Sequence, residues 1–161
     1  VEENLTREDA NKIGKDYLAS IDFPNMQESY FQTQENIITV NYVYKQGDIL
    51  VYPDLIKVKI ALDNGEILGV ETNGYLNSHT ERTDTVATIT KEEAKKVLNK
   101  QLEIQSENLA MIPTKWKTEI LCWEFKGKVE DNEFLVYINA QTGKEEDILV
   151  IVNTPNGTLT H

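Results

Sequence analysis

Nucleophilic catalysis needs a nucleophile beside a base, and this sequence offers few residues for that chemistry. Cys122 is the only cysteine, and the two histidines are His79 and His161. Because Cys122 lies between Leu121 and Trp123 in a run typical of a β-strand, we interpret it as a small core side chain. A single cysteine also excludes an internal disulfide and a zinc site built on cysteines.

Glycoside cleavage needs two carboxylates held at a defined separation around the bond to be cut. Glu124 is the most notable candidate, because alternation places it in a strong predicted strand, on the face shared by Ile120 and Cys122. A half-buried glutamate beside Lys126 or Lys128 explains the position more simply than a lytic role. We therefore expect a protein that is not an enzyme.

The sequence motifs also give little support for a metal site or a phosphate-binding loop. The run DNGE at residues 63–66 resembles part of a calcium loop, but a full loop spreads its ligands over about twelve residues. The residues that follow, ILGV at 67–70, supply none. The glycine-containing run GEILGVETNG follows a predicted turn and opens no helix, unlike a phosphate-binding loop. The sequence predicts no metal and no cofactor.

Aromatic side chains offer the best candidates for contact with a partner. Trp116 follows a Pro-Thr-Lys segment near a predicted loop, so we expect it to be an exposed anchor. Tyr44 and Tyr52 complete the candidate set. Tyr44 also suits a core position, as do Tyr42 and Trp123.

The net charge of the chain argues against some classes of binding partner. The chain has 161 residues and a formal net charge of -11 at pH 7. Such a surface repels phosphate groups, which argues against nucleic acid and anionic lipid as ligands. The sequence has no run of about 20 apolar residues and no signal peptide. Its opening residues, VEENLTRED, indicate a fragment of a longer protein, so any membrane anchor is expected to lie outside this chain.

Two similar segments must position these candidates. In the first, Thr6 and Asp9 form a capping box, and apolar residues at helical spacing follow as far as Phe-Pro-Asn at residues 23–25. Asn64 and Gly65 then predict a type I′ turn in a hairpin at residues 55–75. The inward face of this hairpin is expected to consist of Ile56, Val58, Ile60 and Leu62. Further strands are expected at residues 29–33, 37–44 and 49–52.

The second segment repeats this order. Thr90 and Glu93 form another capping box, and the helical spacing of apolar residues extends to Leu102. Strands are expected at residues 107–112 and 118–126, before a hairpin at 134–152 with Thr142-Gly143 in its turn. The capping threonines lie 84 residues apart and the turn glycines 78 apart. This agreement predicts a duplication in which the second copy lost about six residues from a loop.

We therefore predict an α+β fold of two tandem repeats, each a helix packed on an antiparallel sheet of three to four strands. Repeat 1 is assigned to residues 1–76, the linker to 77–88 and repeat 2 to 89–152. Residues 153–161 form a C-terminal tail, with a turn at Asn156-Gly157.

Each half resembles the PepSY domain, which occurs in propeptides of secreted metallopeptidases and in the YpeB family of spore-germination proteins. The resemblance rests on the starts LTREDANKIGKDYL and ITKEEAKKVLNKQL, and on the hairpins IKVKIALDNGEILGVETNGYL and FLVYINAQTGKEEDILVI. Residues 51–76, the run ILCWEFKG and the closing NTPNGTLT are similar specifically to the C-terminal region of YpeB. The resemblance covers nearly the whole chain and implies the PepSY-like repeats described above.

The resemblance implies a non-enzymatic role outside the cytoplasm, at the spore inner membrane and cortex region. It implies that the chain binds, stabilises or restrains a cortex-lytic peptidoglycan hydrolase of the SleB type in the dormant spore. Direct binding of peptidoglycan is the alternative. The N-terminal anchor and helical region of such proteins would lie outside this chain. Open sheet edges would also allow pairing with a partner strand or self-association.

Overall fold

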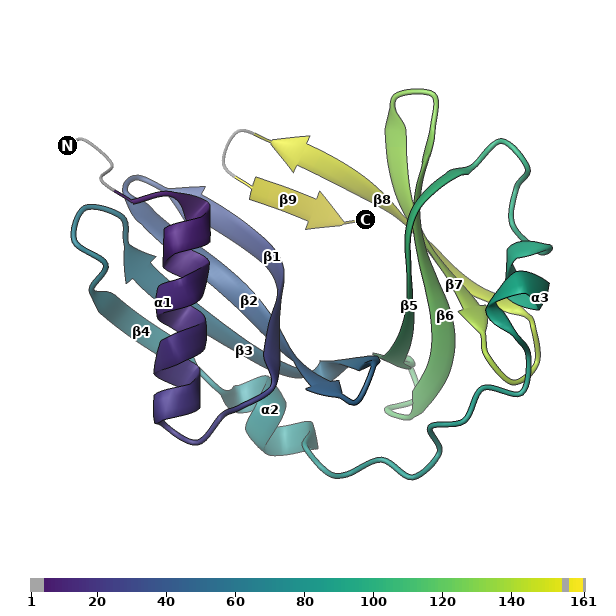
Figure 1. The fold of residues 1–161 in the computed structure, drawn as a ribbon, viewed down its shortest axis with the longest axis horizontal. Coiled ribbons are helices and arrows are strands. Elements are labelled where there is room, and N and C mark those ends of the chain that lie inside the picture. Colours follow the sequence, from purple (N-terminus) through teal and green to yellow (C-terminus); the bar gives the residue numbers. More distant parts are fainter. Residues whose placement is uncertain (1–4, 155–156, 161) are drawn as a thin grey trace. The chain divides into compact units, whose positions relative to one another are not determined.

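The computed structural model describes residues 5–154 and 157–160, and the chain divides into two compact units (Figure 1). Strand β3 (Ile49–Ala61) supplies its first residues to unit 2 and the remainder to unit 1. Unit 1 comprises Val1–Gln46, Pro53–His79 and Asn153–Thr158, and unit 2 comprises Gly47–Tyr52, Thr80–Val152 and Leu159–His161.

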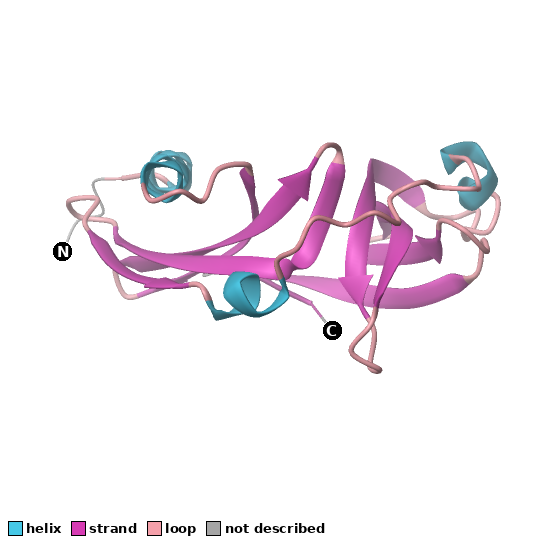
Figure 2. Ribbon diagram, turned by 90° about the horizontal axis from the view of Figure 1, so that it is seen from below, coloured by secondary structure: helices cyan, strands magenta, loops and turns pink. Residues whose placement is uncertain are grey.

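Unit 1 is a helix packed on an antiparallel sheet. Helix α1 (Arg7–Ser20) lies across one face of the strands (Figures 1 and 2) and begins at Thr6 with the predicted capping box. The predicted inward face of the first hairpin is buried against this helix, as expected. The strand order is β1-β2-β3-β4. The bounds are β1 (Met26–Gln34), β2 (Ile37–Gln46), β4 (Ile67–Glu71) and the short helix α2 (Asn73–Ser78).

Unit 2 repeats this plan with a much shorter helix, α3 (Lys91–Lys95), which also starts with the predicted capping box. Its sheet has the antiparallel order β5-β6-β7-β8. The first residues of β3 add a parallel partner, with Ile49 opposite Leu109 and Val51 opposite Met111. The bounds are β5 (Glu103–Pro113), β6 (Glu119–Val129), β7 (Asn132–Asn139) and β8 (Glu145–Thr154), and β9 (Gly157–Thr160) pairs with β1.

The two hairpins close with the same backbone hydrogen bonds. In unit 1 the N–H of Gly65 donates to the carbonyl of Ala61 at 2.8 Å, and in unit 2 the N–H of Gly143 donates to Asn139 at 2.9 Å. Both glycines have positive φ, 76° and 78°, which glycine adopts without steric cost. The predicted pair of tandem α+β repeats is confirmed.

The start of each helix is tied to its own hairpin in the same way. The N–H of Leu5 donates to Leu62 in unit 1, and the N–H of Ile89 donates to Ala140 in unit 2, both at 3.0 Å. Leu62 and Ala140 follow their hairpin strands directly, so helix and sheet are joined at equivalent points of the two repeats. The match indicates that both units descend from one supersecondary plan.

The second strands of the repeats can be aligned through the same two residues. Leu62 and Ala140 each donate their N–H, at 2.9 Å, to the carbonyls of Asn36 and Leu121 respectively. Tyr42 and Gly127 each lie six residues beyond those carbonyls. Tyr42 on β2 and Gly127 on β6 therefore occupy corresponding positions.

In each repeat, one glycine allows the helix or the segment after it to lie close to the sheet. The glycine is on the helix in unit 1 and on the sheet in unit 2. In unit 1 a Cβ on Gly14 of α1 would overlap the hydroxyl of Tyr42. In unit 2 a Cβ on Gly127 would overlap Leu102, which lies between α3 and β5. The large side chain thus comes from the sheet in unit 1 and from the segment after the helix in unit 2.

The predicted type I′ turn at Asn64-Gly65 is wrong. That turn needs positive φ at both central residues, whereas only Gly65 of the pair has it. The side-chain oxygen of Asn64 instead accepts a hydrogen bond from the N–H of Glu66 at 2.9 Å. This local bond makes an Asx turn, so the hairpin loop is longer than two residues.

The second helix is shorter than predicted, because α3 ends at Lys95 rather than near Leu102. Asn99 supplies turn chemistry after it: its side-chain oxygen accepts from the N–H of Gln101, and its carbonyl accepts from the N–H of Leu102. Leu98 still packs in the core of unit 2. The sheet of unit 2 is therefore covered by far less helix than that of unit 1.

Other boundaries also differ. Strand β1 begins at Met26, three residues before the predicted strand, and α2 replaces the end of the predicted hairpin and the start of the linker. A six-residue helix is too short to show an apolar period, which explains why it was missed. The repeat and linker boundaries stay predictions. Residues 155–156 and 161, including Asn156 of the predicted tail turn, lie outside the described residues.

Candidate functional site

Trp116 lies at the tip of the β5–β6 hairpin, and 76% of its surface is exposed. The loop that carries it is closed by Thr114, whose N–H donates to the carbonyl of Thr118 at 2.8 Å. The Lys115 amine lies 5.4 Å from the centroid of the indole ring. An exposed tryptophan on a closed loop suits a binding anchor, although its role in binding stays a prediction.

Tyr44 lies in an aromatic cluster of unit 1. Its ring meets His79 edge-on, with centroids 4.7 Å apart, and the His79 ring stacks on Tyr75 at 4.2 Å. Phe23 also contacts Tyr75 edge-on, with ring centroids 5.0 Å apart. Tyr44 is half-buried and packs against the core, so it serves the structure, and its predicted contact with a partner remains to be tested.

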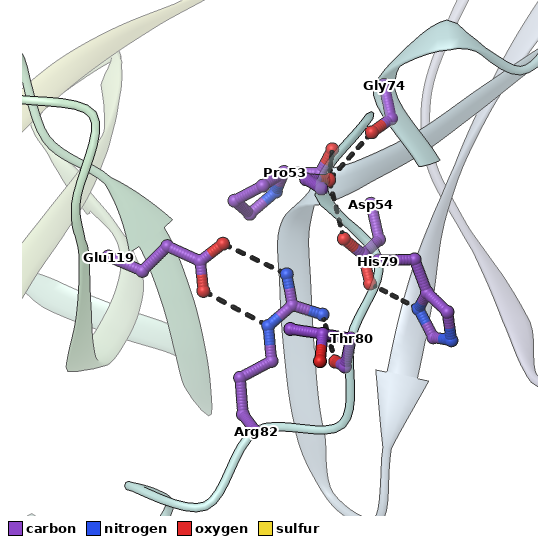
Figure 3. Close-up of polar contacts among 8 residues, drawn as sticks. Pro53, Asp54, Gly74, His79, Thr80, Arg82 and Glu119 are labelled. Carbon is purple, nitrogen blue, oxygen red and sulfur yellow. Dashed lines mark hydrogen bonds and ion pairs between the residues drawn. The ribbon is translucent and has the colours of Figure 1, made fainter. Parts of the chain in front are cut away.

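A polar cluster around the buried Asp54 of unit 1 fixes the position of His79. The side chain of Asp54 is fully buried and accepts hydrogen bonds from His79 Nδ1 and Ser78 Oγ, both at 2.7 Å (Figure 3). The Ser78 oxygen also lies 2.9 Å from the carbonyl of Pro53 and 2.6 Å from that of Gly74. Because Ser78 bonds to the carboxylate and not to the imidazole, these side chains do not make a nucleophile–base pair.

Replacing Ser78 tests this cluster. Ser78→Ala removes the hydroxyl that joins α2 to Asp54, and we expect it to lower the free energy of unfolding by about 1–2 kcal/mol. Ser20→Ala is the matched control, because among the described residues that exposed hydroxyl bonds only to the carbonyl of Tyr17, and we expect a change below about 0.5 kcal/mol. Urea denaturation of both variants gives the comparison. Equal losses of unfolding free energy in the two variants would show that the Ser78 hydroxyl contributes no more to stability than the exposed Ser20 hydroxyl does.

Arg82 makes a second buried polar cluster, in unit 2. Its Nε and Nη2 donate to the two carboxylate oxygens of Glu119 at 3.0 and 2.9 Å (Figure 3). Its Nη1 donates to the carbonyl of Thr80 at 2.9 Å. The Arg82 side chain is only 7% exposed, so this paired geometry fixes the segment after Thr80 to the first residue of β6.

Glu124 is held inside unit 2 by two tyrosines. Its Oε2 accepts from the hydroxyl of Tyr52 at 2.5 Å and from the hydroxyl of Tyr137 at 2.7 Å. The residue is 5% exposed, so the expectation of a half-buried glutamate was wrong. Burial raises the pKa of Glu124, while the bonds from Tyr52, Tyr137 and Asn108 oppose that rise. Lys126 is close enough to lower the pKa of Glu124 as well, as expected of a neighbouring lysine, and its ion pair is with Glu133 at 3.7 Å.

Tyr52, which the sequence offers as a binding candidate, makes a structural hydrogen bond within unit 2. Its hydroxyl reaches Glu124 from the first part of β3, which pairs with β5 in unit 2. The side chain is half-buried. Contact between Tyr52 and a partner stays a prediction.

Cys122 has the environment of a core residue. It is fully buried, and burial raises the pKa of its thiol to about 12. A thiol with that pKa is almost entirely protonated at neutral pH and is a poor nucleophile. The interpretation of Cys122 as a core side chain is confirmed.

The part of the chain that the structure describes offers neither a metal site nor a helix able to span a membrane. No group of three or more His, Cys, Asp or Glu side chains there is arranged to hold a metal ion. No helix there is long and apolar enough to cross a bilayer.

Sequence comparison places both units within known families. Residues 1–85 match the family model for the YpeB sporulation protein, PepSY1 and PepSY2 domains. Residues 88–149 match the PepSY model, described as peptidase propeptide and YPEB domain. The chain belongs to the YpeB family. Its PepSY repeats correspond to the two units described above, as the resemblance implied.

Individual YpeB proteins support this assignment. The chain is 35% identical to sporulation protein YpeB of Halalkalibacterium halodurans over 91% of its own length and 33% of that protein. It is 37% identical to YpeB of Bacillus subtilis over 74% of its own length and 26% of that protein. The chain thus spans about a third or less of these YpeB relatives.

A solved structure identifies the region. The C-terminal domain of Bacillus megaterium YpeB superposes with a TM-score of 0.84 at 28% identity, covering 95% of this chain and 68% of that one. The chain is therefore a YpeB C-terminal PepSY region. The resemblance to the C-terminal region of YpeB is confirmed.

Proposed function

We propose that this chain is a non-catalytic binding module of a spore-germination protein, and that it binds, stabilises or restrains a cortex-lytic peptidoglycan hydrolase of the SleB type. Membership of the YpeB sporulation family carries the proposal. The module would act outside the cytoplasm, at the spore inner membrane and cortex region.

The side chains considered for catalysis support a non-catalytic role. The only thiol is buried and protonated, and the Ser78 hydroxyl is bonded to Asp54 rather than to His79. Glu124 is buried beneath two tyrosine hydroxyls, so its carboxylate does not face solvent as a glycosidase acid would. Exposed apolar side chains such as Trp116 are instead the means by which a binding protein gains affinity.

A binding measurement with the purified chain tests the proposal. We expect it to bind a SleB-type hydrolase, and Trp116→Ala to weaken that binding about tenfold or more, the loss typical of a tryptophan anchor. Val86→Ala is the matched control, because Val86 is 71% exposed in the same unit, and we expect its affinity to equal that of the parent. Lack of binding by the parent, under conditions in which the hydrolase is active, would contradict the proposal.

The second candidate is direct binding of peptidoglycan. The aromatic cluster of Tyr44, Tyr75 and His79 favours it, because aromatic faces combine apolar contact with polar edges. Sedimentation with purified cortex fragments separates the two functions. Recovery of the chain with cortex fragments, together with no binding to the hydrolase, would favour this second candidate.

A further inference from the structure

Unit 2 has an apolar pocket of about 140 Å³ between the segment after α3 and the strands β7 and β8. Leu98 and Leu102 form the wall on the side of the helix, and Val136 and Ile148 form the wall on the side of the sheet. Ile148 is 47% exposed. This pocket leaves apolar side chains of a folded unit in contact with solvent.

The first repeat shows what covers the same place. Val136 and Ile148 are cross-strand partners in unit 2, and Val58 and Val70, each 78 residues earlier, are cross-strand partners in unit 1. The hairpin register also shifts at matching points in the two units. In unit 1, Val58 belongs to the buried core that contains Leu18 of α1, and Val70 is partly buried and packs against that core.

The difference lies in helix length. Helix α1 has 14 residues and α3 has 5, so unit 2 lacks the later turns that cover the sheet in unit 1. Leu98 and Leu102 fill only part of that space and leave the pocket open. Within one chain, the covered repeat thus indicates that a few turns of α-helix fit over this kind of sheet face.

The charge beside the pocket indicates which side chains a helix bound there would carry. Glu145 lines the pocket where the first repeat has Ile67, 78 residues earlier. Glu146 and Asp147 follow it on β8, and all three are exposed. Among the described residues no cation pairs with Glu145, so a lysine or arginine on an incoming helix would find a free carboxylate.

We propose that the apolar pocket of unit 2 accepts a short amphipathic α-helix of a partner protein, with aliphatic side chains on one face and a Lys or Arg that reaches Glu145. Binding of this kind is the helix-in-groove mode, in which apolar side chains spaced i, i+3 and i+7 enter the groove. That the helix belongs to the cortex-lytic hydrolase rests on the proposed function, whereas the fit of a helix to the pocket does not.

A designed peptide tests the pocket without the hydrolase. The probe is a stapled helix of about four turns, with leucines at i, i+3 and i+7 and one lysine beside them, and its control replaces the lysine with glutamate. In NMR titrations of the labelled chain, we expect the lysine peptide to shift the resonances of Leu98, Leu102 and Ile148, and the glutamate peptide to bind several-fold more weakly. Shifts elsewhere, or none, would overturn the proposal.

A pair of matched variants then tests the hydrolase. Ile148→Lys places a charge in the pocket, whereas Leu68→Lys changes a residue of β4 that is 48% exposed and lies outside the pocket. We expect Ile148→Lys to weaken binding of the hydrolase at least tenfold and Leu68→Lys to leave it unchanged. Circular dichroism and urea denaturation check that both variants are folded.

The outcomes separate the two proposals. If the parent does not bind the hydrolase while the lysine peptide shifts the pocket resonances, the helix site stands and the proposed function fails. If the hydrolase binds parent and both variants equally and the peptide causes no shifts, the proposed function stands and the helix site fails. If the parent sediments as a dimer that Ile148→Lys dissociates, the occupant is a second copy of the chain and the helix proposal is overturned.

Discussion

Glu124→Ala is expected to lower the free energy of unfolding by about 2–5 kcal/mol, because it leaves two inward-facing tyrosine hydroxyls without their acceptor. Tyr52 and Tyr137 both donate to one carboxylate oxygen, and alanine offers nothing in its place. Urea denaturation at about pH 5 measures the loss of stability. Tyr137→Phe removes only one hydroxyl and should cost about 1 kcal/mol. Similar values for Glu124→Ala and Tyr137→Phe would contradict this account.

The raised pKa of Glu124 predicts a pH dependence of known sign. Burial lifts the pKa above its ordinary value of 4.5, so the folded protein holds this proton more tightly than the unfolded chain does. The stability that the bound proton contributes is full below about pH 4.5 and is lost as pH rises through the folded-state pKa. Relative to Glu124→Gln, which has no proton to lose, the parent should become less stable across that window.

A series of urea denaturations from about pH 4 to pH 8 checks this prediction. The informative quantity is the difference between the parent and Glu124→Gln, because all other titrating groups are common to both proteins. A difference that stays constant with pH would show that Glu124 has the same pKa in the folded and unfolded chains. A difference that changes in the parent's favour with rising pH would give the pKa shift the opposite sign.

Gly14→Ala is expected to destabilise unit 1 by about 1–3 kcal/mol, although the same change in an exposed helix normally stabilises by up to about 1 kcal/mol. The reason is the Tyr42 hydroxyl, which a Cβ on Gly14 would overlap. That hydroxyl is fixed in place, because it donates to the carbonyl of Asn11 at 2.9 Å. Thermal or urea unfolding of the variant measures the loss.

The double variant with Tyr42→Phe identifies the cause. Removing the hydroxyl takes away the atom nearest to the new Cβ, so Gly14→Ala should cost at least about 1 kcal/mol less in the Tyr42→Phe background than in the parent. An unchanged cost in both backgrounds would show that the overlap is not with the hydroxyl. A stabilised single variant would show that α1 moves away from β2 without loss.

The features predicted correctly from the sequence are those whose signals lie within a few residues of one another. The capping boxes at Thr6 and Thr90 need only a partner three residues on. The alternation of Ile56, Val58 and Ile60 identifies the inward face within a single strand. Agreement between two copies of the same order then makes each assignment stronger than either copy would be alone.

The missed features depend on residues far apart in the chain. Tyr52 and Glu124 are 72 residues apart, and their hydrogen bond exists because β3 pairs in parallel with β5. No pattern among neighbouring residues in the sequence predicts that strand pairing. Asp54 was missed because Ser78, the last residue of α2, and His79, which follows it, reach Asp54 from an element too short to be predicted. The end of α3 was missed because Asn99 breaks an apolar helical period that otherwise continues to Leu102.

The glycine lies on the helix in unit 1 and on the sheet in unit 2. This difference helps to prevent the helix of one repeat from packing on the sheet of the other during folding. Duplicated units in one chain risk exchanging elements, since each helix meets two sheets of the same plan. Helix α1 laid over the second sheet would set Gly14 against Gly127 and leave a void, while Leu102 laid over the first sheet would collide with Tyr42. Side-chain volume thus distinguishes which segment belongs over each sheet, α1 in unit 1 and the segment after α3 in unit 2, and the two halves can share one architecture without being interchangeable.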